Sequence, residues 1–243
     1  GEKVQVNTAA TLHAGGPYVN AQTKVDAILR QEDLTPSQPQ LKGFQFDVWV
    51  DKLHDETVYS QEASVDNKGQ LQTAFTLSEK SKVLYGKLTV ESAVRDDRGK
   101  DVANRATARY VGRDRFVGLK ETGWFLTAGQ AAKVLMAVVD EFGNPVTGTP
   151  IKGKIERKDT KAARVKGAGN AYLAQYNEEW VPEGTCEAKS GAEPSVCAFT
   201  PSKAGDYRVI ATIEDTHKRP HSTELAQWAT GKNEVVWEMA PGN

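Results

Sequence analysis

Two stretches of this chain align without a gap although they lie far apart in the sequence. LTVESAVRD at 88–96 superposes on YRVIATIED at 207–215, at an offset of 207 − 88 = 119 residues. In the same register, Gly112 meets Gly231. Solenoid repeats are much shorter than this period, so the alignment predicts a duplicated domain rather than a repeat array.

A second pair of segments supports the duplication and helps to place its boundary. GPYVNAQTK at 16–24 resembles NPVTGTPIK at 144–152, and both put a proline-containing turn ahead of an extended segment. The charged link Arg113-Asp114-Arg115 follows the last predicted strand of the first copy. We therefore expect two domains, residues 1–113 and 114–243.

The turns of the chain predict what each copy is made of. The pattern D-x-x-G occurs at 66–69, 96–99 and 140–143. An Asp at the first turn position can accept a backbone N–H two residues on, and a Gly at the fourth supplies the positive φ that closes a hairpin. Such turns between short strands are typical of two tandem immunoglobulin- or fibronectin-like antiparallel β-sandwiches, an all-β fold.

Alternation of apolar and polar residues around these turns sets the register of the strands. A period of two means that one face of each strand is buried, and a slip by one residue would put charge into the core. Residues 21–31 are also predicted to be a strand, although they could pass for a helix. The expected inward residues are Val90, Val94, Val209 and Ile213, and the expected outward residues are Arg95 and Glu214.

Composition excludes several classes of function. The chain has 31 basic and 32 acidic residues, so it lacks the electrostatic footprint of a nucleic-acid-binding protein. No stretch approaches the ~18 apolar residues of a membrane helix. No G-x-S-x-G, H-E-x-x-H or phosphate-binding loop occurs, so we expect neither catalysis nor a cofactor.

The two cysteines lie eleven positions apart in CEAKSGAEPSVC, 186–197. Two cysteines and four scattered histidines do not supply a zinc site, and the spacing excludes a C-x-x-C redox pair. Gly191 and Pro194 would let the chain fold back, with Cys186 and Cys197 opposite each other at the base of a loop. A disulfide is favoured over two free thiols and indicates an oxidising compartment.

Other candidate residues have structural interpretations beside functional ones. Asp215, His217 and His221 suggest a metal site, but a solvated hairpin is the favoured interpretation. Tyr207, after Gly205-Asp206, is expected to bond its hydroxyl to nearby backbone. Three aromatic residues are candidate anchors for a domain interface or a partner protein: Trp124, Phe125 and Trp237. The alternative places one ring of the Trp124–Phe125 pair in the core and the other against the neighbouring domain, and Trp237 in the core or at a domain junction.

The segments 117–151 and 197–216, together with NEVVWEM at 233–239, resemble the macroglobulin-like domains of bacterial alpha-2-macroglobulins. The resemblance implies a piece from the front half of a long chain of β-sandwiches. It also implies a periplasmic parent, anchored to the inner membrane of a Gram-negative bacterium, that traps invading proteases. This chain has neither the C-x-E-Q thioester motif nor a lipidated cysteine, so both are expected outside it or absent from the parent.

The resemblance implies a scaffold rather than an enzyme. The expected partners are proteases, met through the full-length parent, and neighbouring macroglobulin-like domains. Nucleic acid is not an expected partner, and a membrane would be reached only through an anchor outside this segment. The alternative is a surface adhesin, or another protein- or carbohydrate-binding β-sandwich module.

Overall fold

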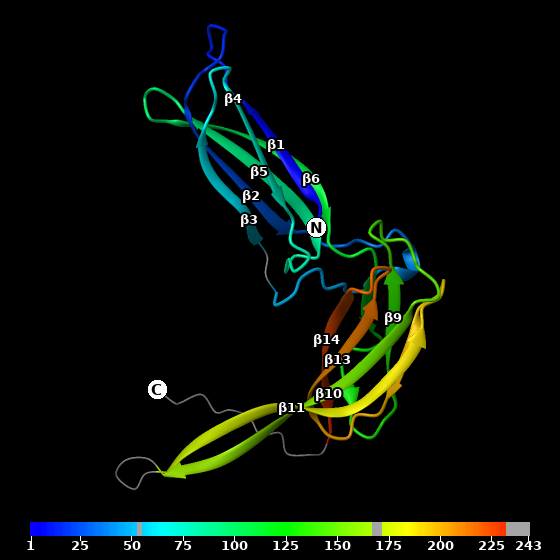
Figure 1. Ribbon diagram of the computed structural model, residues 1–243. Helices are drawn as coiled ribbons and strands as arrows, with labels where there is room; N and C mark the ends of the chain where they lie inside the picture. Colours follow the sequence, from blue (N-terminus) through cyan, green and yellow to red (C-terminus); the bar gives the residue numbers. More distant parts are fainter. Residues whose placement is uncertain (53–54, 167–171, 232–243) are drawn as a thin grey trace. The chain divides into compact units, whose positions relative to one another are not determined.

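The computed structural model describes residues 1–52, 55–166 and 172–231 and is almost entirely β-structure, which confirms the predicted fold class (Figure 1). The chain forms two compact units, one of residues 1–34 and 48–113, the other of residues 35–47 and 114–243. The first half of the chain was expected to be continuous over 1–113. Residues 35–47 instead cluster with the second unit, where Gln45 forms an isolated β-bridge with Leu119.

Unit 1 has two sheets that face each other. A two-stranded sheet has the order β1-β4, and a four-stranded sheet has the order β3-β2-β5-β6 (Figure 1). All pairings in this unit are antiparallel. The strands are β1 (Lys3–Ala9), β2 (Gln22–Gln31), β3 (Asp55–Ser64), β4 (Gln70–Thr76), β5 (Tyr85–Arg95) and β6 (Asp101–Val111).

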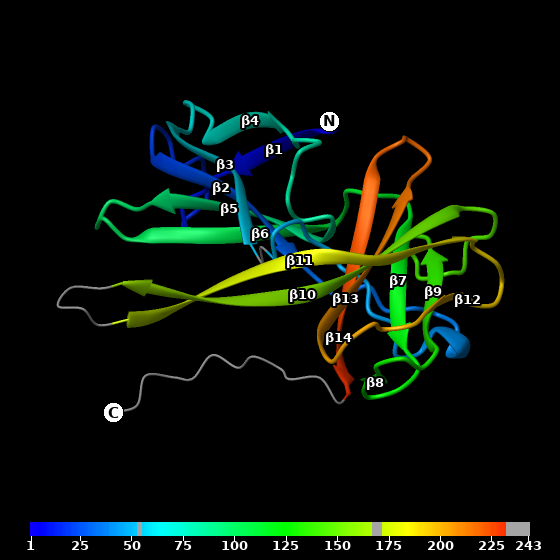
Figure 2. The same ribbon diagram turned by 90° about the horizontal axis from the view of Figure 1, so that it is seen from below.

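Unit 2 has a three-stranded sheet, β12-β9-β7, and a five-stranded sheet, β11-β10-β13-β14-β8 (Figure 2). The long β10–β11 hairpin extends beyond the other strands of its unit in both views. A short 3-10 helix, Pro39–Leu41, lies in the 35–47 segment. The strands are β7 (Phe116–Glu121), β8 (Leu126–Thr127), β9 (Ala132–Val139), β10 (Pro150–Lys166), β11 (Tyr172–Lys189), β12 (Ser195–Phe199), β13 (Gly205–Glu214) and β14 (Pro220–Thr230).

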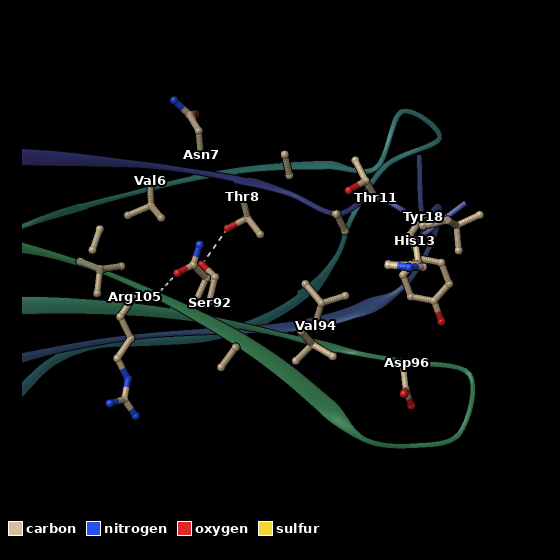
Figure 3. A pocket seen from close by; sticks show the side chains of 18 of the residues that line it. Val6, Asn7, Thr8, Thr11, His13, Tyr18, Ser92, Val94, Asp96 and Arg105 are labelled. Carbon is tan, nitrogen blue, oxygen red and sulfur yellow. Dashed lines mark hydrogen bonds between the residues drawn. The ribbon is translucent and has the colours of Figure 1, made fainter. Parts of the chain in front are cut away.

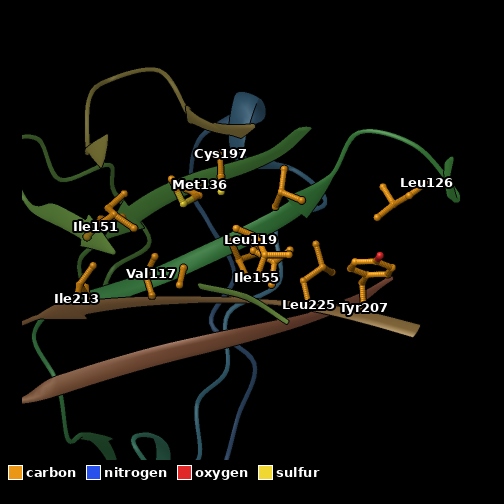
Figure 4. Close-up of a cluster of buried hydrophobic side chains, with 14 of the residues drawn as sticks. Val117, Leu119, Leu126, Met136, Ile151, Ile155, Cys197, Tyr207, Ile213 and Leu225 are labelled. Carbon is orange, nitrogen blue, oxygen red and sulfur yellow. The ribbon is translucent and has the colours of Figure 1, made fainter. Parts of the chain in front are cut away.

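The core of unit 2 lies between its two sheets (Figure 4). Val209 and Ile213 are buried there and Glu214 is exposed, as the alternation predicted. Tyr207 is fully buried, and its hydroxyl donates to the carbonyl oxygen of Lys203 at 2.9 Å. The predicted role of this tyrosine is therefore confirmed.

The core of unit 1 is smaller and divided into two clusters. Val90 packs against one cluster and Val94 against the other, but both are only partly buried. Arg95 is exposed, as predicted. The register is therefore as expected, while the depth of burial is less than in unit 2.

The predicted Asp turns form, and their geometry is the same in all three. One oxygen of each Asp side chain accepts the backbone N–H groups two and four residues on, at 2.7–2.9 Å. A fourth turn of this kind follows β13, where Asp215 accepts from His217 and Arg219. Here Lys218, at φ 62°, holds the position that Gly occupies in the other three.

The pairing registers show that the two units are copies of one plan. Ala27 pairs with Val90 in unit 1 as Ile155 pairs with Val209 in unit 2. An isolated bridge joins Thr11 to Pro17 and another joins Val139 to Pro145, at a common offset of 139 − 11 = 128 residues. β1 therefore corresponds to β9, β2 to β10, β4 to β12, β5 to β13 and β6 to β14.

Candidate functional site

The disulfide between Cys186 and Cys197 is present, with a Cα–Cα distance of 5.6 Å. It was expected in a polar loop, but the structure places it between strands. Cys186 lies on β11 in the five-stranded sheet, and Cys197 lies on β12 in the three-stranded sheet. Cys197 is fully buried in the core. The bridge thus links the two sheets of unit 2 rather than closing a surface loop.

Strand β10, which lies beside the disulfide, has a glycine where the disulfide needs space. Gly153 of β10 pairs with Cys186, and a Cβ at Gly153 would lie 2.2 Å from the Cys186 Sγ. Real Cβ atoms do not approach another heavy atom so closely, so any other residue here would displace the bridge. The bridge is part of the packing of unit 2.

The candidate anchors Trp124 and Phe125 lie in the connection between β7 and β8. Trp124 is 94% exposed and Phe125 is 62% exposed, so neither ring is in the core, where the alternative interpretation placed one of them. Exposed Trp residues are enriched in binding hot spots. Their role as anchors stays a prediction, and Trp237 lies outside the described residues.

The metal hypothesis around the β13–β14 turn has a partial geometric basis. Asp114, Asp215 and His217 have potential ligand atoms within 4.8 Å of one another. The oxygens of Asp215, however, already accept two backbone N–H groups and the guanidinium of Arg219, with Nε at 2.8 Å. A carboxylate with these hydrogen-bond partners stabilises the turn.

The environment of Asp215 explains its charge state. Burial alone would raise the pKa of its carboxyl group. The hydrogen bond and charge of Arg219, with the two backbone N–H groups, outweigh burial and hold the pKa below its ordinary value. Asp215 therefore stays ionised in the folded unit at neutral pH.

His221 was expected in a solvated hairpin, and that expectation is wrong. Its side chain is 1% exposed, and its Nδ1 accepts the backbone N–H of Val117 at 3.0 Å. Its other ring nitrogen lies 2.6 Å from the carbonyl oxygen of Asp47. His221 thus joins β14 to β7 and to the 35–47 segment. Its position on the inner face of β14 explains why the sequence pattern misled.

The long hairpin of unit 2 has a charged surface near its base. Arg157 donates to Glu183 and to Asp159, each at 2.8 Å. Arg208 bonds to Glu156 and also lies over the ring of Trp180, 4.3 Å from its centroid. Each of these two arginines is therefore paired with at least one carboxylate.

Unit 1 has an open groove between β1 and the strands β5 and β6 (Figure 3). Its volume is about 700 Å³. In Figure 3, Val6 and Thr8 project from β1 toward β5, and the Thr8 hydroxyl is 2.7 Å from that of Ser92. No motif pointed to this groove. Its lining is dispersed over several strands and turns of unit 1, so no local sequence signal marks it.

The geometry defines a class of fold: two tandem antiparallel β-sandwiches related by duplication, without a catalytic constellation among the described residues. No family model matches the sequence, and no curated protein matches it. Among the described residues, no helix is long and apolar enough to cross a membrane.

Solved structures share this fold. E. coli alpha-2-macroglobulin in its native conformation matches 94% of this chain with 16% identity and a TM-score of 0.59. The same protein activated by porcine elastase matches 96% with 16% identity and a TM-score of 0.61. Salmonella alpha-2-macroglobulin reacted with methylamine matches 93% with 14% identity and a TM-score of 0.55. The similarity expected from the sequence is thus confirmed at the level of the fold.

This chain corresponds to a small part of those proteins. It covers 15%, 21% and 16% of the three chains, respectively. The matched region of this chain includes both units in each case, because it spans more than nine-tenths of the residues. What is shared is therefore the tandem of two sandwiches, not a single immunoglobulin-like unit.

Proposed function

We propose that this chain is a scaffold segment of a protein that traps proteases in the manner of bacterial alpha-2-macroglobulins. The observation that carries the proposal is the match of both sandwiches to those proteins over 93–96% of the chain. A single sandwich recurs in many unrelated proteins, so a match of a tandem is the more specific argument.

The architecture of the units supports a mechanical role. The sheets of unit 2 are joined by a buried core, by the bridge between Cys186 and Cys197 and by His221. A wall that holds its shape while other parts of a large protein rearrange needs such cross-links. In the proposed role, the attacking protease cuts a bait elsewhere in the parent, and these units contribute rigid walls and domain contacts without catalysing a reaction.

The proposal includes a place in the cell. A disulfide persists in oxidising compartments, which supports the periplasm as the location of the parent. The organisms of the similar structures, E. coli and Salmonella, fit that location. Anchoring of the parent to the inner membrane is part of the same proposal.

The test uses the complete product of the gene that encodes this sequence. After incubation with elastase, residual activity is measured on a large protein substrate and on a small peptide substrate. A trap removes activity on the large substrate and leaves activity on the small one, because a small molecule still reaches the enclosed protease. If the treated elastase keeps the same fraction of the activity of free elastase on the large substrate as on the small one, the proposal is overturned. The 243-residue chain alone is the control and should protect neither substrate.

A binding module of a surface adhesin is the second candidate, favoured by the exposure of Trp124 and Phe125. Exposed aromatic rings are the side chains with which such a module would contact a carbohydrate or a protein. Binding to a glycan array that is lost in Trp124→Ala, together with no protection in the elastase assay, would establish this function instead.

A further inference from the structure

The segment 44–47 is held on unit 2 by its backbone and by its side chains. Gln45 and Leu119 of β7 exchange two backbone hydrogen bonds, at 2.8 and 3.0 Å. The ring of Phe46 lies against Gly118, where a Cβ would come within 2.4 Å of the ring. The chain before residue 35 and after residue 47 belongs to unit 1. Docking of the segment therefore fixes, on unit 2, a stretch of chain that leaves unit 1 and returns to it.

His221 binds the end of this segment, and its surroundings allow one tautomer. A backbone N–H can only donate, so Nδ1, which receives the N–H of Val117 at 3.0 Å, carries no proton. The backbone oxygen of Asp47 can only accept, so Nε2, which lies 2.6 Å from it, carries the proton. The ring is buried and packs edge-to-face against Phe116, with 4.9 Å between the ring centroids. The docked state thus contains a neutral imidazole.

A second proton has no suitable place on the ring of His221 while the segment is docked. A protonated Nδ1 would turn an N–H toward the N–H of Val117, so a hydrogen bond would be replaced by two facing donors. The ring would also carry a charge in a buried position. Once the segment detaches, Nε2 loses its partner and the ring can turn toward water, where an imidazole takes up a proton with a pKa of about 6.5.

The charged side chains on the elements around His221 have partners of their own. One carboxylate oxygen of Asp47 accepts the backbone N–H of Glu224 at 2.9 Å, and the other accepts the side-chain amide of Gln45 at 3.1 Å. The remaining charged groups pair as follows: Asp114 with Thr216, Arg115 with Thr149, Lys120 with the backbone oxygen of Lys42, Arg208 with Glu224, Glu214 with Lys218 and Asp215 with Arg219. Acid therefore acts on the docked ring through its bonds to Val117 and Asp47.

We propose that His221 is a pH-sensitive switch that weakens the docking of the segment 44–47 in mild acid. The detached state takes up a proton and the docked state does not, so detachment becomes more frequent as the pH falls below about 6.5. The ratio of detached to docked molecules rises about tenfold between pH 7.5 and pH 5.5 for a group that titrates in the detached state alone. This response is separate from that of Asp215, a carboxyl group whose pKa lies below its ordinary value.

Hydrogen exchange followed by NMR tests the switch in the unmodified chain. The quantity measured is the opening equilibrium at the amides of Gln45, Asp47 and Leu119, after division by the intrinsic exchange rate at each pH. Opening at these amides should increase about tenfold from pH 7.5 to pH 5.5, while amides in the β10–β13 pairing keep their protection. No change at the three amides, or an equal change in the β10–β13 pairing, would overturn the proposal.

Three variants assign the response to one group. His221→Gln is the matched variant, because its side chain offers an acceptor to Val117 and a donor to Asp47 but takes up no proton near neutral pH. Opening in His221→Gln should be the same at both pH values. His217→Gln changes an exposed histidine, and Asp47→Asn removes a carboxylate but keeps the backbone oxygen, so both should retain the tenfold response. A response that persists in His221→Gln, or that disappears in either control, would overturn the assignment to His221.

The ring nitrogens provide a test that does not depend on the stability of any variant. Long-range proton–nitrogen NMR spectra of the unmodified chain at pH 7.5 should show a neutral His221 with its proton on Nε2. A proton on Nδ1 instead would overturn the proposal. An imidazolium at pH 5.5 in molecules whose Gln45 and Asp47 amides stay protected would also overturn it, because the docked state would then accept the proton.

Discussion

The strands β6 and β14 occupy the same place in the two copies, yet one is exposed along most of its length and the other is buried at every second residue. Both pair with their neighbour in the same register, Val90 with Ala106 and Val209 with Leu225. The difference lies in what covers them. In unit 2, β7 and the 35–47 segment bond to β14, whereas unit 1 has no counterpart of β7 among the described residues.

The comparison shows that alternation fixes which face of a strand turns inward but not how far it is buried. Burial depends on a partner from another part of the chain. The sequence of β14 is adapted to that partner, since His221 and Thr223 use their side chains to bond with the backbone of β7. The corresponding residues of β6, Val102 and Asn104, are exposed.

The largest effect is expected from a charge placed at matched positions of β14 and β6. Leu225→Asp should destabilise unit 2 by about 3–5 kcal/mol, because the carboxylate would enter a packed core. Ala106→Asp should change the stability of unit 1 by about 0.5 kcal/mol or less, because that position is exposed. Urea unfolding of each variant measures both, and equal losses would break the comparison.

The second effect distinguishes the units by their cross-link. Reduction of the bridge, or its replacement in Cys186→Ala/Cys197→Ala, should cost unit 2 about 3 kcal/mol, because the unfolded chain gains freedom. Unit 1 has no cysteine and should keep its melting temperature. Thermal unfolding with and without reductant tests this, and alkylation with intact mass counts the free thiols. Two free thiols in the non-reduced, periplasmically expressed protein would contradict the account.

The third effect compares two turns of the same form. Asp215→Ala should cost about 2 kcal/mol, because Arg219 and two backbone N–H groups lose a buried partner. Asp96→Ala should cost about 1 kcal/mol or less, because water reaches that turn. Chemical unfolding of the two variants measures the difference.

The turn at Asp215 also predicts a response to acid. The pKa of the Asp215 carboxyl group is lower in the folded than in the unfolded state. Its contribution to the stability of unit 2 is therefore present above the unfolded pKa and is lost as the pH falls through the folded pKa. The acid-induced loss of stability of unit 2 below about pH 4 should therefore be smaller in Asp215→Asn. Glu214→Gln, at the exposed neighbouring position, is the control and should leave the profile as it is. An identical profile for Asp215→Asn and the original chain would exclude this role.

The smallest effect concerns the position where the four turns differ. Lys218 has a positive φ that the other turns give to glycine. Lys218→Gly should stabilise unit 2 by up to about 1 kcal/mol, since relief of backbone strain is partly offset by the freedom that glycine gives the unfolded chain. Gly99→Lys, the reverse change in unit 1, should destabilise that unit by a similar amount. A melting temperature lowered by Lys218→Gly would contradict this interpretation of the turn.

Local features of the chain were predictable because local chemistry determines them. The Asp turns, the strand at 22–31, the inward valines and the Tyr207 hydroxyl bond follow from backbone geometry and from the period of the side chains. The inter-sheet position of the disulfide was not predictable, because a loop sequence does not show which sheet each flanking strand joins. The burial of His221 and the transfer of residues 35–47 to unit 2 depend on contacts over more than a hundred residues.

The most direct test of the central comparison is hydrogen exchange of the unmodified chain, measured by mass spectrometry on peptides that cover β6 and β14. The two strands correspond residue by residue, so matched peptides from the same sample compare the exposed strand with the covered one. We expect the segment 220–230 to exchange much more slowly than the segment 101–109 under native conditions. Equal protection of the two segments would show that β6 is covered as β14 is, and would contradict the view that burial of these matched strands differs between the two units.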